Sequence, residues 1–249
     1  MRLTDRSASK GAAEPRSDFR VFGFGRRLLY LRRDFGHEAQ ALFARLAELR
    51  GAAGVGNRQS GFVIGLGGSE IFVRHSRRGG MMRLLLNDVY LGFRARPATE
   101  LAVALEARRR GIPVADPIGA MIEWVAPCLY RGFFMTRAMT GMTMWDFVRT
   151  DDDPDVRRHV IENACAAIAT MHRMGVAHAD LNLHNLFVTR SHDSFTVALL
   201  DLDKARLFDG PAPTNLRRKN LLRLRRSARK LDPSARYLDA RLLDLLTRL

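Results

Sequence analysis

One short segment of the chain holds side chains that could transfer a phosphoryl group. It reads His178-Ala-Asp-Leu-Asn-Leu-His-Asn185, and a second acid, Asp201, follows the apolar run Val197–Leu200. A hydroxyl that attacks a γ-phosphate needs a carboxylate to orient it and accept its proton, and we assign that role to Asp180. Mg²⁺ prefers hard oxygen ligands and usually takes one or two carboxylates together with phosphate oxygens. We therefore predict that Asn185 and Asp201 are metal ligands.

The elements around this segment are suited to position it. Asp153 and Pro154 predict the start of a helix and Gly175 predicts its end, because Asp caps helix N-termini, Pro suits the first turn and Gly favours the residue after the last turn. The apolar runs Leu186–Val188 and Val197–Leu200 predict two strands that a polar turn separates. A helix, a tight loop and a hairpin that ends in an acid are therefore expected in this order.

The segment matches the pattern H-x-D-L-x-x-x-N, the catalytic loop of protein-kinase-like phosphotransferases. In those enzymes a strand that ends in Asp holds magnesium, as we predict for Asp201. The competing interpretation is a chance match in which the His and Asn side chains are structural. For His178 we prefer a structural role, in which it braces the loop, to a role as the base.

Upstream, Ile71–Arg74 occupies the place of the strand whose lysine grips ATP phosphates, with arginine in place of lysine. Arginine can hold a phosphate through two hydrogen bonds. Glu100 lies in the first turn of a helix predicted from Pro97 to Gly111, where it would form the ion pair that positions Arg74. The alternative is a carboxylate favoured only by the helix N-terminus.

A glycine-rich stretch, Gly51–Gly61, precedes this strand and leads into a hairpin predicted over residues 62–73. Backbone N–H groups at Gly54, Gly56 and Gly61 could cover the phosphates of ATP. The stretch does not have the spacing G-x-G-x-x-G. It is a candidate nucleotide-binding loop without the usual motif.

Length and composition fit a globular protein without covalent crosslinks. The chain has 249 residues, of which 47% are hydrophobic and 27% charged. Its two cysteines, Cys128 and Cys165, form neither a disulfide framework nor a zinc ribbon. There is no apolar run of about 18 residues and no apolar region near the N-terminus that is typical of a secretory signal, so we expect a cytoplasmic protein.

Positive charge is concentrated near the two ends. The formal net charge is +15, and Arg217–Lys230 holds eight basic residues and no acid. Residues 1–33 hold nine basic and three acidic residues. This distribution predicts an anionic partner, such as acidic lipid headgroups, a phosphorylated substrate or nucleic acid.

The acceptor is expected to be smaller than a polypeptide. Little chain follows Asp201, and that part contains no A-P-E motif, whereas protein kinases need an activation segment and further helices there. Ala179 also replaces the arginine of H-R-D. A small molecule, a sugar or a glycolipid fits better.

Taken together, the chain resembles the lipopolysaccharide core kinase family and, within it, the 3-deoxy-D-manno-octulosonic acid (Kdo) kinases. The resemblance covers about residues 50–230 and rests on the following stretches, in chain order: Phe72–His75 through Arg78–Gly80, Asn87–Tyr90, Gly111–Pro117, His178–Asn185, Leu200–Asp203 and Asn220–Ser227. Two positions depart from the usual pattern, since Ser76 and Leu202 stand where Kdo kinases usually carry aromatic residues.

The resemblance implies ATP- and magnesium-dependent phosphorylation of the 4-hydroxyl of Kdo on lipid A, at the cytoplasmic face of an inner membrane. It implies an α+β, two-lobed, protein-kinase-like fold with a β-rich N-lobe and a shortened helical C-lobe. We expect a disordered basic tail over 1–17, an extension with a helix over 18–50, the N-lobe over 51–136 and the C-lobe over 137–249.

The basic segment gains a specific interpretation, because lipid A is a polyanion in a membrane. A helix predicted from Leu216 to Leu231 would present Leu221, Leu222 and Leu224 among its basic residues and dock on an anionic membrane. The alternative is that these leucines pack on the C-lobe and the arginines are solvated.

Three rival functions remain open. The first is a heptose kinase of the same family, and the second is a small-molecule kinase of the aminoglycoside or choline type, which gives no reason for the basic segment. The third is a pseudokinase or a basic binding module, which Arg74 in place of lysine keeps open. We do not expect nucleic acid as a partner, because aromatic residues that could stack on bases do not alternate with the charges.

Overall fold

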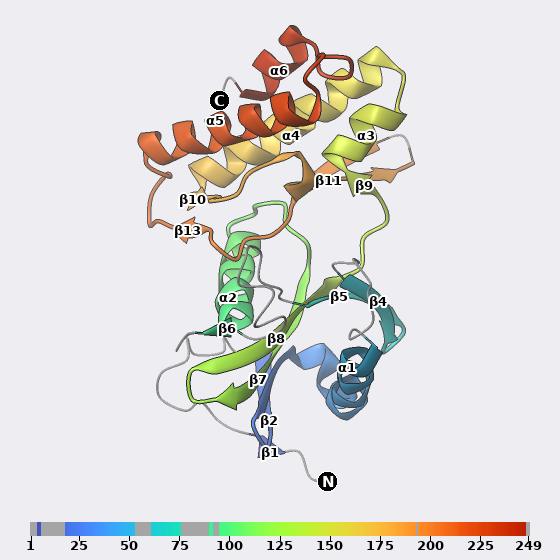
Figure 1. The fold of residues 1–249 in the computed structure, drawn as a ribbon, viewed down its shortest axis with the longest axis vertical. Coiled ribbons are helices and arrows are strands. Elements are labelled where there is room, and N and C mark those ends of the chain that lie inside the picture. The colour runs from blue at the N-terminus through green and yellow to red at the C-terminus, as the bar shows by residue number, and fades with distance from the viewer. Residues whose placement is uncertain are drawn as a thin grey trace. The chain divides into compact units, whose positions relative to one another are not determined.

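The computed structural model describes residues 4–5, 18–52, 61–75, 90–91, 95–192 and 194–247. The chain forms two compact units (Figure 1). The first contains Met1–Ala102 and Asp116–Ala138, and the second contains Val103–Ala115 and Met139–Leu249. The first is built on a sheet and the second is mainly helical, so the predicted α+β class is confirmed.

The first unit is built on one antiparallel sheet. Its strands pair in the order β1-β2-β3-β7-β8-β5-β4, and β6 pairs with β8. Their bounds are β1 Thr4–Asp5, β2 Phe19–Phe24, β3 Arg27–Arg32, β4 Gly61–Leu66, β5 Ser69–His75, β6 Tyr90–Leu91, β7 Pro117–Ala126 and β8 Leu129–Arg137. Strands β4 and β5 form the hairpin predicted over residues 62–73.

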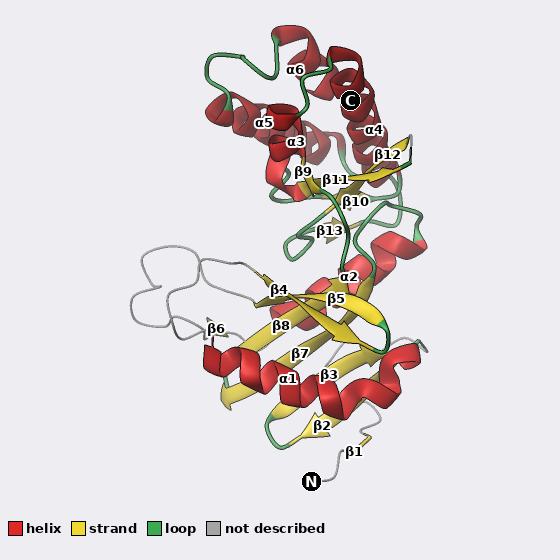
Figure 2. Cartoon of the chain, turned by 90° about the vertical axis from the view of Figure 1, so that its right-hand side faces the viewer, coloured by secondary structure: helices red, strands yellow, loops and turns green. Residues whose placement is uncertain are grey.

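A helix covers one face of this sheet. The 3-10 turn η1 (Arg33–Glu38) leads into α1 (Ala39–Ala52), which Figure 2 shows lying across the strands. Leu42 and Leu46 of α1 are fully buried against side chains of the sheet that include Leu31 and Met135. Burial of such side chains stabilises each by about 1.5–3 kcal/mol relative to exposure, so this layer is the core of the unit.

Helix α2 (Arg96–Arg109) follows β6 along the chain. It begins one residue before Pro97, and Gly111 has a φ of +75° just beyond its end, as the sequence predicts. The backbone N–H of Arg96 donates to the hydroxyl of Tyr130 on β8, 3.0 Å away. This bond fixes the start of α2 on the sheet.

Helices make up most of the second unit. Their bounds are α3 Met144–Thr150, α4 Pro154–Arg173, α5 Thr214–Leu231 and α6 Ala240–Thr247. Helix α4 has the predicted punctuation: the carboxylate of Asp153 accepts from two backbone N–H groups of the first turn, and Gly175 follows the end with a φ of +79°. Helix α6 packs on α4 and α5 (Figure 1).

Among the described residues, five short strands and one 3-10 turn surround the segment that contains Asp180, and all of them except β9 lie between α4 and α5 in the sequence. They are β9 Met142–Thr143, β10 Val176–Ala177, η3 Leu183–Asn185, β11 Leu186–Ser191, β12 Ser194–Leu199 and β13 Arg206–Leu207. One sheet has the order β12-β11-β9, and β10 pairs with β13. The predicted strands are thus present as β11 and β12, and Val114 bridges Leu199 at the end of β12.

The sequence predicts two segments before the N-lobe, and the structure describes mainly the second of them. Residues 1–17, expected to be disordered, lie outside the described residues except for Thr4 and Asp5 in β1. Residues 18–50, expected to be an extension with a helix, supply most of α1 and also β2 and β3, and β3 pairs with β7 inside the sheet.

Candidate active site

Hydrogen bonds hold both the backbone N–H and the backbone carbonyl of Asp180. Its backbone N–H donates to Nδ1 of His178 at 3.1 Å. Its carbonyl oxygen accepts from the side-chain amides of Asn182 at 2.9 Å and Asn185 at 2.8 Å. The carboxylate remains about half exposed, at 48%. The loop therefore fixes the backbone of Asp180 and presents its carboxylate to solvent.

Two asparagines stabilise the turn that follows. Oδ1 of Asn182 accepts from the backbone N–H groups of His184 and Asn185 and caps η3. Since Nδ2 of Asn185 donates to the carbonyl of Asp180, Oδ1 of Asn185 is the atom oriented away from that bond. An amide oxygen in this orientation is a ligand that Mg²⁺ accepts.

His178 braces the loop from inside the protein. Its side chain is buried, Nε2 donates to the carbonyl oxygen of Leu200 at 2.8 Å, and Nδ1 accepts from Asp180. This pair of contacts requires the neutral tautomer with hydrogen on Nε2. Burial lowers the pKa of His178, although the Leu200 carbonyl and the carboxylates of Asp201, Asp180 and Asp203 act in the opposite direction. The geometry agrees with the structural role expected for His178.

Asp201 stands directly after Leu200, in a backbone conformation that few residues adopt. Its φ is +58°, in the left-handed region that Asp tolerates better than most residues other than glycine. The backbone N–H of Leu200 donates to the carbonyl of Asn185 at 2.9 Å, and Leu202 is buried. Both neighbours are thus fixed. Asp201 directly follows a residue that is hydrogen-bonded to both His178 and Asn185 of the loop. Its role as a metal ligand stays a prediction.

Sequence reasoning missed two residues of α5 that contact the loop. Asn220, buried at 6% exposure, accepts from the backbone N–H of His178 at 3.0 Å and donates to its carbonyl at 2.7 Å. Nη1 of Arg223 lies 3.0 Å from Oδ1 of Asp180. The available signal for Asn220 was its place among the apolar residues of α5, which include Leu221 and Leu224, because an amide buried among such residues needs hydrogen-bond partners. Arg223 belongs to the basic segment predicted to meet an anionic partner, but no local pattern placed it beside Asp180.

In the first unit, Arg74 and Glu100 form the predicted ion pair. Nη2 of Arg74, on β5, contacts Oε1 of Glu100, on α2, and the Glu100 side chain is only 3% exposed. The guanidinium also lies over the Phe134 ring, 5.9 Å from its centroid. A buried carboxylate needs such a partner, so Glu100 does more than favour a helix N-terminus.

Only part of the predicted nucleotide loop can be placed. Gly54 and Gly56 lie outside the described residues, as do Arg78–Gly80. Gly61 is the first residue of β4 and pairs directly with Arg74 on β5. A side chain at Gly61 would collide with the Phe72 ring, so packing by itself requires glycine at this position.

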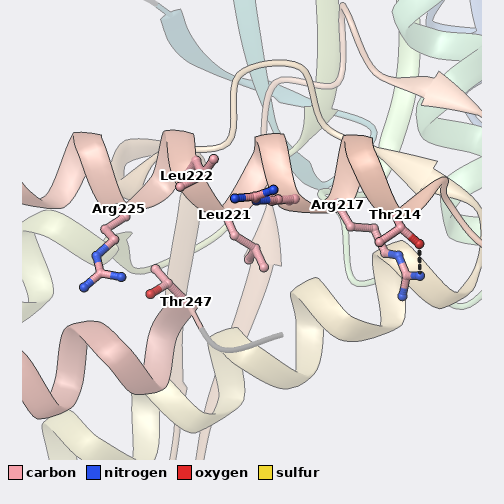
Figure 3. Close-up of a pocket in the computed structure, with 7 residues that line it drawn as sticks. Thr214, Arg217, Leu221, Leu222, Arg225 and Thr247 are labelled. Atoms are coloured by element: carbon pink, nitrogen blue, oxygen red, sulfur yellow. Dashed lines mark hydrogen bonds between the residues drawn. The ribbon is translucent and has the colours of Figure 1, made fainter.

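The basic helix α5 buries two of the three leucines considered for membrane contact. Leu221 and Leu224 are buried in the second unit, whereas Leu222 is 47% exposed. A pocket of about 310 Å³ lies on this helix and reaches Thr247 of α6 (Figure 3). Its lining residues are Thr214, Arg217, Arg218, Leu221, Leu222, Arg225 and Thr247. The pocket is thus separate from Asp180 and combines guanidinium groups with an apolar floor.

The donor set of the loop fits a magnesium ion. Asn185 and Asp201 offer one amide oxygen and one carboxylate, which leaves other positions of an octahedral ion to phosphate oxygens and water. Within the described ranges there is no group of three or more His, Cys, Asp or Glu side chains that could hold a metal ion. The two cysteines are free thiols.

These observations define the class of protein. An Arg–Glu pair lies on a β-rich unit, and a braced H-x-D-L-x-x-x-N loop followed by a turn with Asp lies on a helical unit. This is the arrangement of a phosphotransferase with a protein-kinase-like fold. The solved structure of WaaP in complex with acyl carrier protein has a similar fold, with a TM-score of 0.52 and 20% sequence identity over 78% of this chain and 77% of that one.

The chain belongs to the lipopolysaccharide kinase (Kdo/WaaP) family, whose model matches residues 53–242. The 3-deoxy-D-manno-octulosonic acid kinase of Xylella fastidiosa (strain 9a5c) is 30% identical over 183 residues, or 72% of this chain and 70% of that protein. The enzyme with the same name from Vibrio vulnificus (strain YJ016) is 30% identical over 165 residues, which covers 64% of each chain. The chain is therefore a kinase of lipopolysaccharide biosynthesis.

Proposed function

We propose that this enzyme transfers the γ-phosphoryl group of ATP to the 4-hydroxyl of Kdo on lipid A. The observation that carries the proposal is the fixed position of Asp180, whose backbone is held by three hydrogen bonds while its carboxylate stays half exposed. The choice of Kdo as the acceptor is supported by the names of the relatives from Xylella fastidiosa and Vibrio vulnificus.

In this proposal Asp180 is the base. It accepts a hydrogen bond from the acceptor hydroxyl and takes the proton as the oxygen attacks. A bond forms between that oxygen and the γ-phosphorus, the bond from this phosphorus to the β-γ bridging oxygen breaks, and ADP leaves. Because the loop holds the backbone of Asp180, the carboxylate needs little reorganisation to reach the hydroxyl.

Other residues would bind the nucleotide. Asn185 and Asp201 would hold magnesium, which neutralises charge on the phosphates when it is bound. Arg74, positioned by Glu100, would bind phosphate oxygens through its guanidinium. Backbone N–H groups at Gly54, Gly56 and Gly61 would complete the phosphate contacts.

The acceptor would be reached at the cytoplasmic face of the inner membrane, by a peripheral contact through α5. The exposed basic residues of this helix are Arg218, Lys219, Arg223, Arg226, Arg229 and Lys230. Each Lys or Arg near an anionic surface adds about 1 kcal/mol of attraction. Leu222 and the pocket beside it offer an apolar contact among these charges. None of the helices in the described part of the chain is long and apolar enough to cross a membrane.

The test is phosphate transfer from ATP and Mg²⁺ to a purified Kdo–lipid A precursor, followed by mass spectrometry. We expect one added phosphate on the Kdo unit, and loss of at least 1,000-fold in rate for Asp180→Asn. Arg158→Gln, which removes an exposed ion pair with Glu162 on α4, is the control and should keep the wild-type rate. No transfer to the precursor by wild-type enzyme would contradict the proposal.

A heptosylated core serves as the second acceptor in the same assay. Transfer to this acceptor alone would identify a heptose kinase, which shares the scaffold. Failure to bind ATP or to modify either acceptor would instead favour a pseudokinase.

A further inference from the structure

A cation from outside the catalytic loop lies on the carboxylate of Asp180. Nη1 of Arg223, on α5, is 3.0 Å from Oδ1 of Asp180, although 43 residues separate them in the sequence. Both side chains are about half exposed, at 49% and 48%. The pair therefore stands at the surface of the site, where a substrate can reach it.

The position of Arg223 is set by its own helix. One turn earlier on the same side of α5, Asn220 bonds to the backbone N–H and the carbonyl of His178 and contacts Nε2 of His172 at 3.1 Å. These bonds are buried, so they fix α5 against the loop independently of the Arg223 side chain. Residues three apart on a helix lie on the same face, which directs Arg223 to the residue two beyond His178.

The loop itself supplies no cation. Residues 178–185 include Asp180 but neither lysine nor arginine. In phosphoryl transfer the negative charge of the transferred group is spread over its three equatorial oxygens, and fixed cations stabilise that charge. A guanidinium has five N–H donors arranged as a fork, so one can bond to Asp180 while others bond to a second anion.

We propose that Arg223 is a substrate-binding residue that holds an anionic oxygen next to the Asp180 carboxylate. This proposal rests on the proposed function, because Asp180 is the base in it. The anionic oxygen belongs either to the transferred phosphoryl group or to the carboxylate of the acid sugar. In both cases Arg223 also keeps the Asp180 carboxylate oriented, through Oδ1.

Two variants separate charge from shape. Arg223→Gln removes the charge and keeps a hydrogen-bond donor, and Arg223→Lys keeps the charge without the fork. Arg158→Gln is again the control, because it removes an exposed arginine that pairs with a carboxylate elsewhere in the same unit. Thermal unfolding of each variant should match wild type, since exposed pairs contribute little to stability.

The readouts are steady-state kinetics and calorimetric titration of ATP with Mg²⁺ and, separately, of the Kdo–lipid A precursor in detergent. We expect Arg223→Gln to lose at least 100-fold in kcat/KM and Arg223→Lys to lose less than the Gln variant. If the phosphoryl group is the anion, kcat falls and the affinity for ATP weakens, while the affinity for the precursor is unchanged. If the sugar carboxylate is the anion, the affinity for the precursor weakens by about tenfold and the affinity for ATP is unchanged, and the rest of the loss in kcat/KM is a fall in kcat from the misoriented Asp180 carboxylate.

Other results would overturn the proposal. Arg223→Gln with kinetics and affinities within twofold of wild type would make the contact a surface ion pair without function. A faster Gln variant would mean that Arg223 blocks Asp180. If wild-type enzyme binds ATP but does not phosphorylate the precursor, the proposed acceptor is wrong, and the effect of Arg223→Gln on ATP affinity still decides the phosphoryl case.

Discussion

Nε2 of His178 lies 2.8 Å from the carbonyl oxygen of Leu200, the residue that precedes Asp201. One imidazole thereby joins the two acids of the site, because its other nitrogen accepts from the backbone N–H of Asp180. The contact with Asp180 requires a neutral ring, because only an unprotonated Nδ1 can accept. The backbone contact that braces Asp180 therefore depends on the protonation state of a buried side chain.

This dependence predicts that stability falls in mild acid. Burial lowers the pKa of His178, and also that of His172, below the ordinary value of 6.5. As pH falls through 6.5, these histidines become protonated in the unfolded chain but stay neutral in the folded protein. The free energy of unfolding therefore decreases. Urea unfolding at pH 7.5, 6.5 and 5.5 should show this decrease, and it should be smaller in His178→Gln.

His172→Gln provides a second test of the same linkage, should the His178 variant fail to fold. Its pH dependence should also be weaker than that of wild type. Wild-type stability that stays constant between pH 7.5 and 5.5 would contradict the prediction.

Removal of the Asn220 side chain should affect both stability and catalysis. Asn220→Ala leaves the buried N–H and carbonyl of His178 without partners, which costs about 1–3 kcal/mol per group. We expect loss of about 2–4 kcal/mol of unfolding free energy and at least tenfold lower kcat. The control is Asn163→Ala, which removes a bond to the Phe195 carbonyl and should lower stability without changing kcat. Equal effects of the two variants on kcat would remove the case for a positioning role of Asn220.

The Arg74–Glu100 pair predicts a specific effect on nucleotide binding. Arg74→Met should weaken the affinity for ATP by at least tenfold, and Arg74→Lys should restore part of it, because charge remains but the fork is lost. Arg27→Met is a matched control: Arg27 has the same side-chain exposure, 27%, and pairs with Glu123 on the same sheet. ATP affinities measured by calorimetry decide the matter, and equal affinities for the Met variants would exclude Arg74 as a phosphate ligand.

Gly175 should tolerate no side chain. Its φ is +79°, and a Cβ there would collide with the backbone carbonyls of Phe208 and Gly210. The left-handed conformation costs roughly 1–2 kcal/mol for a residue other than glycine, and the collision adds strain between β10 and β13. We expect Gly175→Ala to lose about 2–4 kcal/mol of unfolding free energy in urea. The same substitution at Gly65, which has open space around it, should cost far less.

Membrane contact through α5 is tested by sedimentation with anionic liposomes. Loss of Arg226, Arg229 and Lys230 to Ser should lower binding about 100-fold at low salt, since each charge adds about 1 kcal/mol. A charge-matched triple variant of Arg158, Arg173 and Arg190, exposed on other elements, should bind nearly as wild type. If both triple variants lose binding equally, net charge rather than α5 accounts for it.

Local signals predicted local structure well. Asp153 and Gly175 mark the ends of α4 because caps depend on a few neighbouring residues. The Arg74–Glu100 pair joins residues 26 positions apart, and it was expected only because the strand and the helix match the kinase pattern. To predict that Leu221 and Leu224 are buried, one must know which face of α5 packs on the second unit, and periodicity alone does not show this.

The contacts of Asn220 and Arg223 with the loop were beyond sequence reasoning for a related reason. They join residues 42 and 43 positions apart, and no short-range preference encodes such a pairing. The strands β2 and β3 were missed similarly, because their pairing with each other and with β7 depends on the assembled sheet.

The path of the chain through its two units has a consequence for synthesis and dissection. Residues 103–115 belong to the second unit, although the stretches on both sides belong to the first. During translation residues 103–115 are synthesised before β8, but the bridge between Val114 and Leu199 can form only after β12 has been synthesised. No single cut yields both units intact: a fragment that starts at Met139 lacks Pro113, whose carbonyl accepts from the backbone N–H of Leu199. A C-terminal piece that includes residues 103–115 keeps this contact but also removes β7 and β8 from the sheet of the first unit.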